Sequence, residues 1–269
     1  MNTTAAFDRT AARRIAAAFL PSRGHGNRWH YHYSRIKLGS DPLYPGVAAA
    51  LRGSVAPLLD LGCGIGLLAH ALHDEGVTLA YRGVDNDAAK IAEACRAARS
   101  ADLPDATFHV VDLAGVLPMH RGSVAILDVL QYLGDDSQRR LLHAAIAMLT
   151  PGARLVIRSG LEDDSPRMWV TRAIDWFGSG IGWMNTAPRR YPRERDLRAA
   201  LENAGLQADF TSLRGNTPFN NWLVVATLPE QHVVAPEAGV PAFESATDQP
   251  LPTLDSRLPG SSMSGNTVR

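Results

Sequence analysis

Three glycines stand between a short apolar run and a helical pattern, and they mark the first place where this chain could hold a ligand closely. The run 58–61 is followed by Gly62, Gly64 and Gly66, and the helical pattern opens at Leu67. This order predicts a buried strand, a tight turn and the start of a helix. Glycine lets the backbone approach a ligand that a Cβ would keep away, and a helix start offers free N–H groups.

The spacing of the glycines separates two classes of ligand that use this geometry. The dinucleotide fingerprint is Gly-x-Gly-x-x-Gly, and its third glycine would stand at position 67, where this chain has leucine. The third glycine comes one residue early, at Gly66. The fit to a nicotinamide dinucleotide is therefore poor.

Four acidic residues stand at the carboxyl ends of predicted strands: Asp60, Asp85, Asp112 and Asp128. Ligands of parallel sheets bind outside these ends, so the four acids can line one site. Asp85 follows the glycine turn by about twenty residues, where a carboxylate can accept hydrogen bonds from ribose hydroxyls. A single aspartate at such a position is often only a helix cap or a turn residue.

Strand and helix patterns alternate from residue 58 onwards. Apolar residues recur at helical spacing within the helices, as Leu141, Leu142 and Ala145 do in the helix predicted over 137–149. Such alternation predicts an α/β fold with a parallel sheet that is covered on both faces. The predicted strands are 58–61, 79–84, 106–111, 123–127, 154–157, 206–213 and 222–227, and the predicted helices are 15–20, 43–51, 67–72, 88–99, 137–149 and 193–204.

The sequence Asp-Leu-Gly-Cys-Gly-Ile-Gly at 60–66 resembles motif I of the class I S-adenosylmethionine-dependent methyltransferases. The resemblance covers about 58–227. It implies a Rossmann-like sheet of parallel strands with a closing antiparallel C-terminal hairpin and helices on both faces. It also implies S-adenosyl-L-methionine as the cofactor.

The same resemblance assigns roles to the strand-end residues. Asp60 would brace the glycine turn and the methionine ammonium, Asp85 would bind the ribose, and Asp128 would lie beside the methionine end. Asp112 would accept the exocyclic amine of adenine while Leu113 packs on the ring. The expected cofactor-binding residues are Asp60, Gly62, Cys63, Gly64, Gly66, Asp85, Asn86, Asp112, Leu113 and Asp128.

Composition divides the chain into an arm, a main domain and a tail. Residues 1–45 form a basic arm whose aromatic side chains and histidines suit either packing on the core or a lid over donor and acceptor. Residues 46–228 hold the methyltransferase-like domain, with an aromatic-rich insert at about 159–191 that in this family helps to form the acceptor pocket. Residues 229–269 are expected to be a disordered tail, because proline and small residues scatter there without periodicity.

Methyl transfer to an oxygen, or to a carbon beside an aromatic hydroxyl, requires a base to remove a proton. The candidates are His30 and His32 in the arm and Tyr132 after the fourth strand, and the sequence does not choose among them. The fourth strand continues as Asp-Val-Leu-Gln-Tyr, unlike the Asn/Asp-Pro-Pro-Tyr/Phe of enzymes that methylate amino groups of nucleobases or glutamine. Flipped-base chemistry is therefore disfavoured, and a small or medium-sized organic acceptor is expected.

Composition also limits which binding partners and which cell compartment we expect. The 27 basic and 27 acidic residues sum to zero charge, so no general field attracts nucleic acid or a membrane. Two cysteines, Cys63 and Cys95, form neither a disulfide framework nor a zinc pattern, so we expect no metal and a reducing, cytoplasmic compartment. No apolar run approaches the roughly 20 residues that span a bilayer.

The arm carries a second resemblance. Arg-Ile-Lys-Leu at 35–38 and Asp-Pro-Leu-Tyr at 41–44 resemble the arm of bacterial methyltransferases that accompany aryl-polyene and fatty-acid-like synthesis genes. This implies an aromatic or acyl acceptor, presented on an acidic carrier protein. A set of arginines would dock the carrier or be ordinary surface charge. These are Arg189, Arg190, Arg193 and Arg195.

Two alternatives to a methyltransferase stay open. A nicotinamide-dependent oxidoreductase is opposed by the glycine spacing and by the closing hairpin. A non-catalytic module that binds S-adenosylmethionine is distinguished from an enzyme only by turnover.

Overall fold

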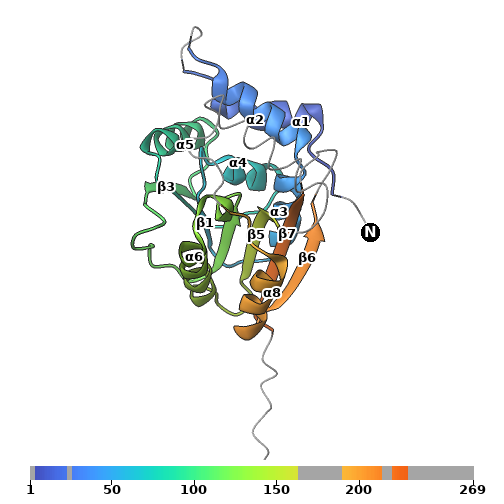
Figure 1. Cartoon of the computed structure of the whole chain (residues 1–269). Coiled ribbons are helices and arrows are strands. Elements are labelled where there is room, and N and C mark those ends of the chain that lie inside the picture. The colour runs from blue at the N-terminus through green and yellow to red at the C-terminus, as the bar shows by residue number, and fades with distance from the viewer. Residues whose placement is uncertain (1–3, 23–25, 163–189, 214–219, 230–269) are drawn as a thin grey trace, which may run out of the picture. The chain divides into compact units, whose positions relative to one another are not determined.

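The computed structural model describes residues 4–22, 26–162, 190–213 and 220–229, which lie within one unit that spans residues 1–230. At its centre is a seven-stranded sheet with the order β3-β2-β1-β4-β5-β7-β6 (Figure 1). The strands are β1 (Leu58–Leu61), β2 (Tyr81–Asp85), β3 (Ala106–Val110), β4 (Ser123–Leu127), β5 (Arg154–Gly160), β6 (Gln207–Ser212) and β7 (Asn221–Thr227).

Neighbouring strands from β3 to β5 are parallel, and β7 runs antiparallel to β5 on one side and β6 on the other. Parallel neighbours need crossover connections, which here carry helices. The strand order reverses at β1, whose two neighbours are β2 and β4. The expected parallel sheet with an antiparallel C-terminal hairpin is confirmed.

Helices cover both faces of the sheet (Figure 1). Successive strand residues enter opposite cores, so Leu58 belongs to the first core and Leu59 to the second. Helices α1 to α5 pack in the first core, and α6 and α8 pack in the second. The helices are α1 (Arg9–Ala16), α2 (Trp29–Ser40), α3 (Leu43–Leu51), α4 (Leu67–Asp74), α5 (Ala88–Ser100), α6 (Asp135–Ala147) and α8 (Glu194–Asn203), with short 3₁₀ helices η1 (Ala17–Phe19) and η2 (Leu130–Tyr132).

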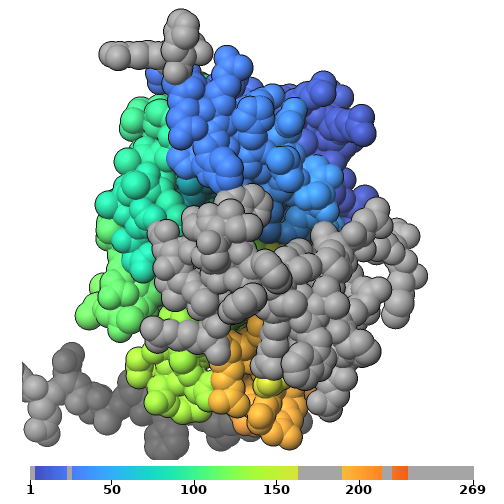
Figure 2. Space-filling model, turned by 45° about the horizontal axis from the view of Figure 1, so that its top comes forward, coloured from blue at the N-terminus to red at the C-terminus, as the bar shows by residue number. Residues whose placement is uncertain are grey.

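The described part of the arm packs on the first core. Ile15, Phe19 and Leu38 are buried there. Arg14 of α1 donates to both carboxylate oxygens of Asp74 in α4, at 2.7 and 2.8 Å. On the face shown in Figure 2 the blue arm adjoins the teal surface of α5.

Several element bounds differ from those predicted. The first helix begins at Arg9 rather than at 15, because Asp8 caps it by accepting the N–H groups of Thr10 and Ala11. Strand β5 continues to Gly160 because β7 pairs with its whole length. Strand β3 ends at Val110, which leaves Asp112 two residues beyond it.

Parts of two predicted segments lie outside the described residues: 163–189 of the expected insert and 230–269 of the expected tail. Among the helices that are described, none is both long and apolar enough to cross a membrane. The described ranges also contain no group of three or more His, Cys, Asp or Glu side chains arranged to hold a metal ion.

Candidate functional site

The glycine turn between β1 and α4 is shaped by its neighbours. Gly62 and Gly66 have φ values of 86° and 77°, in the left-handed region that favours glycine. A Cβ on Gly62 would lie 2.3 Å from a methyl group of Val129, and one on Gly66 would lie 2.6 Å from the Phe108 ring. In front of Gly64, by contrast, no described atom lies within 4 Å of where a Cβ would be. The turn therefore presents open space at its middle glycine.

Asp85, at the end of β2, fastens this turn. Its Oδ2 accepts the N–H of Gly64 at 3.0 Å, and its Oδ1 accepts the N–H of Asp87 at 2.9 Å. The side chain is buried, and each oxygen keeps a further lone pair. Asn86 beside it is exposed. Asp85 thus lies where the resemblance expects the ribose-binding carboxylate, and it also orders the loop.

Asp60, in β1, is a buried carboxylate with one oxygen unused. Tyr81 donates its hydroxyl to Oδ2 at 2.5 Å, while Oδ1 has no hydrogen-bond partner among the described residues. Burial raises the pKa of Asp60 to about 7. An unsatisfied buried acceptor is costly, and a cationic donor such as an ammonium group would satisfy it.

The other expected cofactor-binding residues differ from one another in burial and in their contacts. Asp112 is exposed, and its Oδ1 accepts the N–H of Ala114 at 2.9 Å. Leu113 is half-buried against the second core. Cys63 is buried against Gly83, and burial raises the pKa of its thiol. It is therefore a packing residue without thiolate character.

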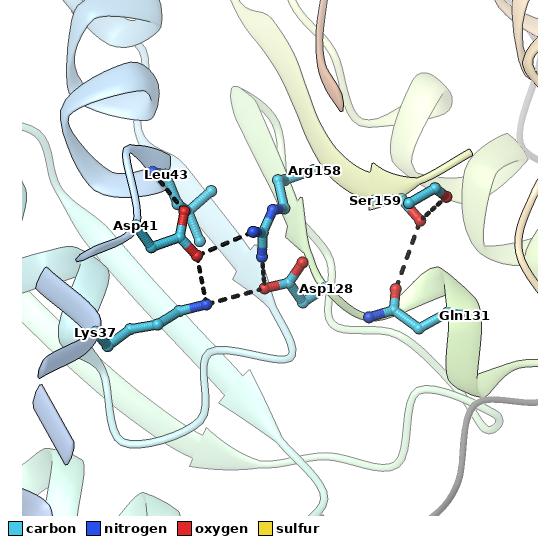
Figure 3. Close-up of polar contacts among 8 residues, drawn as sticks. Lys37, Asp41, Leu43, Asp128, Gln131, Arg158 and Ser159 are labelled. Atoms are coloured by element: carbon cyan, nitrogen blue, oxygen red, sulfur yellow. Dashed lines mark hydrogen bonds and ion pairs between the residues drawn. The ribbon is translucent and has the colours of Figure 1, made fainter. Parts of the chain in front are cut away.

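Asp128 follows β4 directly and is drawn into a group of charges. Its Oδ2 accepts a hydrogen bond from Arg158 of β5 and lies 3.6 Å from Lys37 Nζ of α2 (Figure 3). Beyond it, in η2, Gln131 lies 3.5 Å from the hydroxyl of Ser159. Sequence reasoning did not foresee the charged partners of Asp128. The sequence signal that could have indicated them was Arg158, a charged residue directly after the apolar run 155–157 within strand β5.

The three candidate bases occupy two regions. His30 of α2 lies 3.2 Å from a carboxylate oxygen of Glu93 in α5. His32, on the same helix, is exposed, and its ring centroid is 5.1 Å from that of Tyr31. Tyr132 is half-buried in η2, just after the fourth strand. The contacts of His30 and His32 thus run to α5 and along α2 itself.

Tyr44, in α3, was not singled out from the sequence. Burial raises its pKa well above the ordinary value, and the negative charges of Asp41, Asp128 and Asp60 act in the same direction. Its hydroxyl makes no hydrogen bond to a described residue. Tyr44 thus places a protonated phenol within the field of acids from the ends of β1 and β4.

This chain is similar to known proteins in one stretch of sequence and in its fold. Residues 58–152 match the family described as a methyltransferase domain. Comparison with curated proteins gave no match.

Solved structures of methyltransferases share the fold. An O-methyltransferase family protein from Burkholderia thailandensis is 19% identical with a TM-score of 0.57, and the match covers 74% of this chain and 59% of that one. Magnesium protoporphyrin IX methyltransferase from Synechocystis PCC 6803, with bound S-adenosylhomocysteine, is 20% identical with a TM-score of 0.54, over 81% of this chain and 92% of that one.

A third similar structure contains two bound compounds. It is an O-methyltransferase from neocarzinostatin biosynthesis in complex with S-adenosylmethionine and 2-hydroxy-5-methyl naphthoic acid. The identity is 18% and the TM-score 0.52, over 73% of this chain and 55% of that one. The chain therefore spans 59% and 55% of the lengths of the two O-methyltransferases.

Proposed function

We propose that this chain, which carries a class I S-adenosylmethionine-dependent methyltransferase domain, transfers the donor's methyl group to an oxygen or carbon of a small or medium-sized organic acceptor. The observation that carries the proposal is the glycine turn with open space at Gly64 beside the unpartnered buried Oδ1 of Asp60. An open glycine turn that follows a strand with an unpartnered buried carboxyl oxygen suits a ligand with a positively charged amino acid end.

The residues around the turn would hold the donor at several points. Asp60 Oδ1 would accept from its ammonium, and Asp85 would accept from the ribose hydroxyls while keeping the turn in place. Leu113 would pack on the adenine. When bound, S-adenosylmethionine supplies a methyl group on a sulfonium, open to in-line attack by a nucleophile. What remains for the protein is mainly alignment of the acceptor and removal of its proton.

For the acceptor we favour an oxygen on an aromatic or acyl group. A protonated Tyr44 can donate a hydrogen bond to such an acceptor. His32 and Tyr132 stay candidate bases, whereas Glu93 engages His30. We also retain a role for the arm as a cover over donor and acceptor, since Lys37 of α2 reaches Asp128 at the end of β4.

An acidic carrier protein is less well supported than a free small molecule. Three of the four arginines expected to dock it already face acids. Arg190 lies 3.0 Å from Asp135, and Arg193 lies 3.2 Å from Glu162. Arg195 lies 3.3 Å from Asp196, and Arg189 lies outside the described residues.

Calorimetric titration with S-adenosylmethionine, S-adenosylhomocysteine and NADH tests the proposal. We expect micromolar binding of both sulfur ligands and no binding of NADH. Asp85→Ala should abolish binding, while Asp209→Ala, an exposed aspartate on β6, should leave it unchanged. Binding of NADH alone, or of nothing, would refute the methyltransferase assignment.

Turnover then separates an enzyme from a non-catalytic binding module. Formation of S-adenosylhomocysteine is measured over a panel of hydroxylated aromatic and acyl acceptors. Binding without turnover of any acceptor would favour the module.

A further inference from the structure

Four charged side chains, two of them buried and two partly buried, form a cluster that joins the arm to the carboxyl ends of β4 and β5 (Figure 3). Lys37 Nζ lies 2.6 Å from Asp41 Oδ2 and 3.6 Å from Asp128 Oδ2. Arg158 donates to the same two oxygens, from Nη2 to Asp41 at 2.9 Å and from Nη1 to Asp128. Each carboxylate oxygen thus meets both cations, and the four formal charges cancel.

Within the cluster, Asp41 and Arg158 are held in their ionised forms. The side chains of Arg158 and Asp41 are only 5% and 8% exposed. Burial alone would raise the pKa of Asp41, but Arg158 and Lys37 outweigh it and the pKa is lowered. Burial would likewise lower the pKa of Arg158, but Asp128 and Asp41 raise it. Buried charges are not needed to hold the arm against the sheet, because apolar contacts stabilise such packing at least as well.

Asp128 is clamped by Arg158 from two sides. Its φ of 59° lies in the left-handed region, which non-glycine residues seldom adopt and which recurs at functional sites. The carbonyl oxygen of Arg158 accepts its N–H at 2.8 Å, while the guanidinium donates to its Oδ2. The side chain is 29% exposed, and Oδ1 takes no part in the cluster.

The cluster borders the glycine turn. Strands β1 and β4 are paired neighbours, so Asp60 and Asp128 lie at the same edge of the sheet. Val129, next to Asp128, is the residue that a Cβ on Gly62 would strike. The charges of Asp60 and Asp128 both act on the Tyr44 hydroxyl. A charged ligand over the turn would therefore feel the field of the cluster.

We propose that the cluster of Lys37, Asp41, Asp128 and Arg158 sets how strongly the donor site prefers the cationic methyl donor over its neutral thioether product. This inference rests on the proposed function. S-adenosylmethionine carries a sulfonium charge that S-adenosylhomocysteine lacks. Two cations beside the site would favour the uncharged thioether, and the two carboxylates offset them. The balance within the cluster therefore fixes the preference.

Two substitutions separate this role from simple fastening. Asp41→Asn and Lys37→Met break the same ion pair but change the charge in opposite directions. Titration of the full-length chain with each ligand gives the ratio of the two dissociation constants. Asp41→Asn should lower the preference for S-adenosylmethionine, and Lys37→Met should raise it, each by about three- to tenfold for one unit charge at the edge of a partly solvated site.

A fastening role predicts a different result. Both variants would then weaken both ligands to the same extent, and the ratio would stay at its wild-type value. That outcome would overturn the inference. If Asp41→Asn fails to fold, Lys37→Met and Lys37→Gln carry the test alone, because the Lys37 side chain is 24% exposed.

Arg154→Met is the matched control. Arg154 also ties β5 to a helix packed in the first core, by donating to the carbonyl oxygen of Ala50 in α3, but it makes no described contact with the cluster. Its loss should leave the ratio unchanged, with thermal unfolding recording any change in stability. If the wild-type chain binds neither ligand, the proposed function fails. If it binds both and the variants leave the ratio unchanged, only this inference fails.

Discussion

Alanine at Gly64 and alanine at Gly66 should separate ligand binding from folding within one turn. Both glycines have positive φ, 55° and 77°. At Gly66 a Cβ would lie 2.6 and 2.8 Å from two Phe108 ring atoms and 3.1 Å from the Cβ of Ala94. At Gly64 it would meet no described atom within 4 Å. The two substitutions therefore share backbone strain but differ in steric overlap.

The magnitudes follow from that difference. A left-handed alanine costs about 1–2 kcal/mol, and overpacking of a filled core adds about 1–3 kcal/mol. We expect Gly66→Ala to lower the free energy of unfolding by about 2–5 kcal/mol and Gly64→Ala by about 1–2 kcal/mol. Against a typical stability of about 5–15 kcal/mol, Gly64→Ala should stay folded.

Urea unfolding measures the stabilities, and calorimetry measures S-adenosylmethionine affinity. Gly64→Ala should lose affinity by about five- to 150-fold, because overlap of one methyl group with a ligand costs about 1–3 kcal/mol. Gly76→Ala is the matched control, since its φ is 68° and its Cβ would also meet open space. Wild-type affinity in Gly64→Ala would place the donor elsewhere. Equal stabilities of Gly66→Ala and Gly76→Ala would refute the packing argument.

Four further outcomes can be measured. Burial raises the pKa of Asp60 to about 7, so S-adenosylmethionine should bind more tightly as the pH rises through 7, and Asp60→Asn should flatten that dependence in calorimetry. The folded chain also keeps the Asp60 proton to a higher pH than the unfolded chain does, so the stability that Asp60 contributes should fall as the pH rises from about 4 to about 7. The urea midpoint of Asp60→Asn should therefore depend less on pH than that of the wild type, and an equal dependence would contradict this. Burial lowers the pKa of His70 to about 4. The unfolded chain therefore binds the proton first, and stability should drop as the pH falls from about 6.5 towards 4. Thermal unfolding of His70→Phe should show a smaller drop. Asp87→Ala removes the side chain that accepts the N–H groups of Ala89 and Lys90 at the start of α5, which should cost about 1 kcal/mol; an unchanged urea midpoint would refute that cap.

The sheet and the turn could be predicted because their signals are local. Apolar runs bounded by aspartate or glycine located β1, β2 and β4 to within two residues. The acids at strand ends follow from the rule that parallel strands share a carboxyl edge. Asp112 lies two residues beyond the end of β3, at the start of a turn in which its carboxylate accepts the N–H of Ala114.

The charged cluster could not be predicted, because its members are distant in the chain. Asp41 and Arg158 are separated by 117 positions, and no periodicity relates them. The sequence suggested that the arm either packs on the core or forms a lid, and neither interpretation placed Lys37 of α2 and Asp41, which follows α2, at the ends of β4 and β5. Which residues form an ion pair depends on which helices and strands pack together in the fold. A sequence pattern predicts each helix or strand separately and does not predict how they pack.

The position of α3 in the fold has a consequence for the order in which parts of the chain can pack during synthesis. Gly46 lies so close to the C-terminal hairpin that a Cβ there would be 3.3 Å from Leu213 and 3.4 Å from Leu223. Strand β7, which carries Leu223, comes last along the chain among the strands that the structure describes, yet it lies between β5 and β6 in the sheet. During synthesis, the edge of β5 that pairs with β7 therefore stays open, and α3 lacks its contact with Leu223, until residues beyond 221 are present. A chain truncated before residue 221 should therefore expose that edge of β5 and the part of α3 that Leu223 covers.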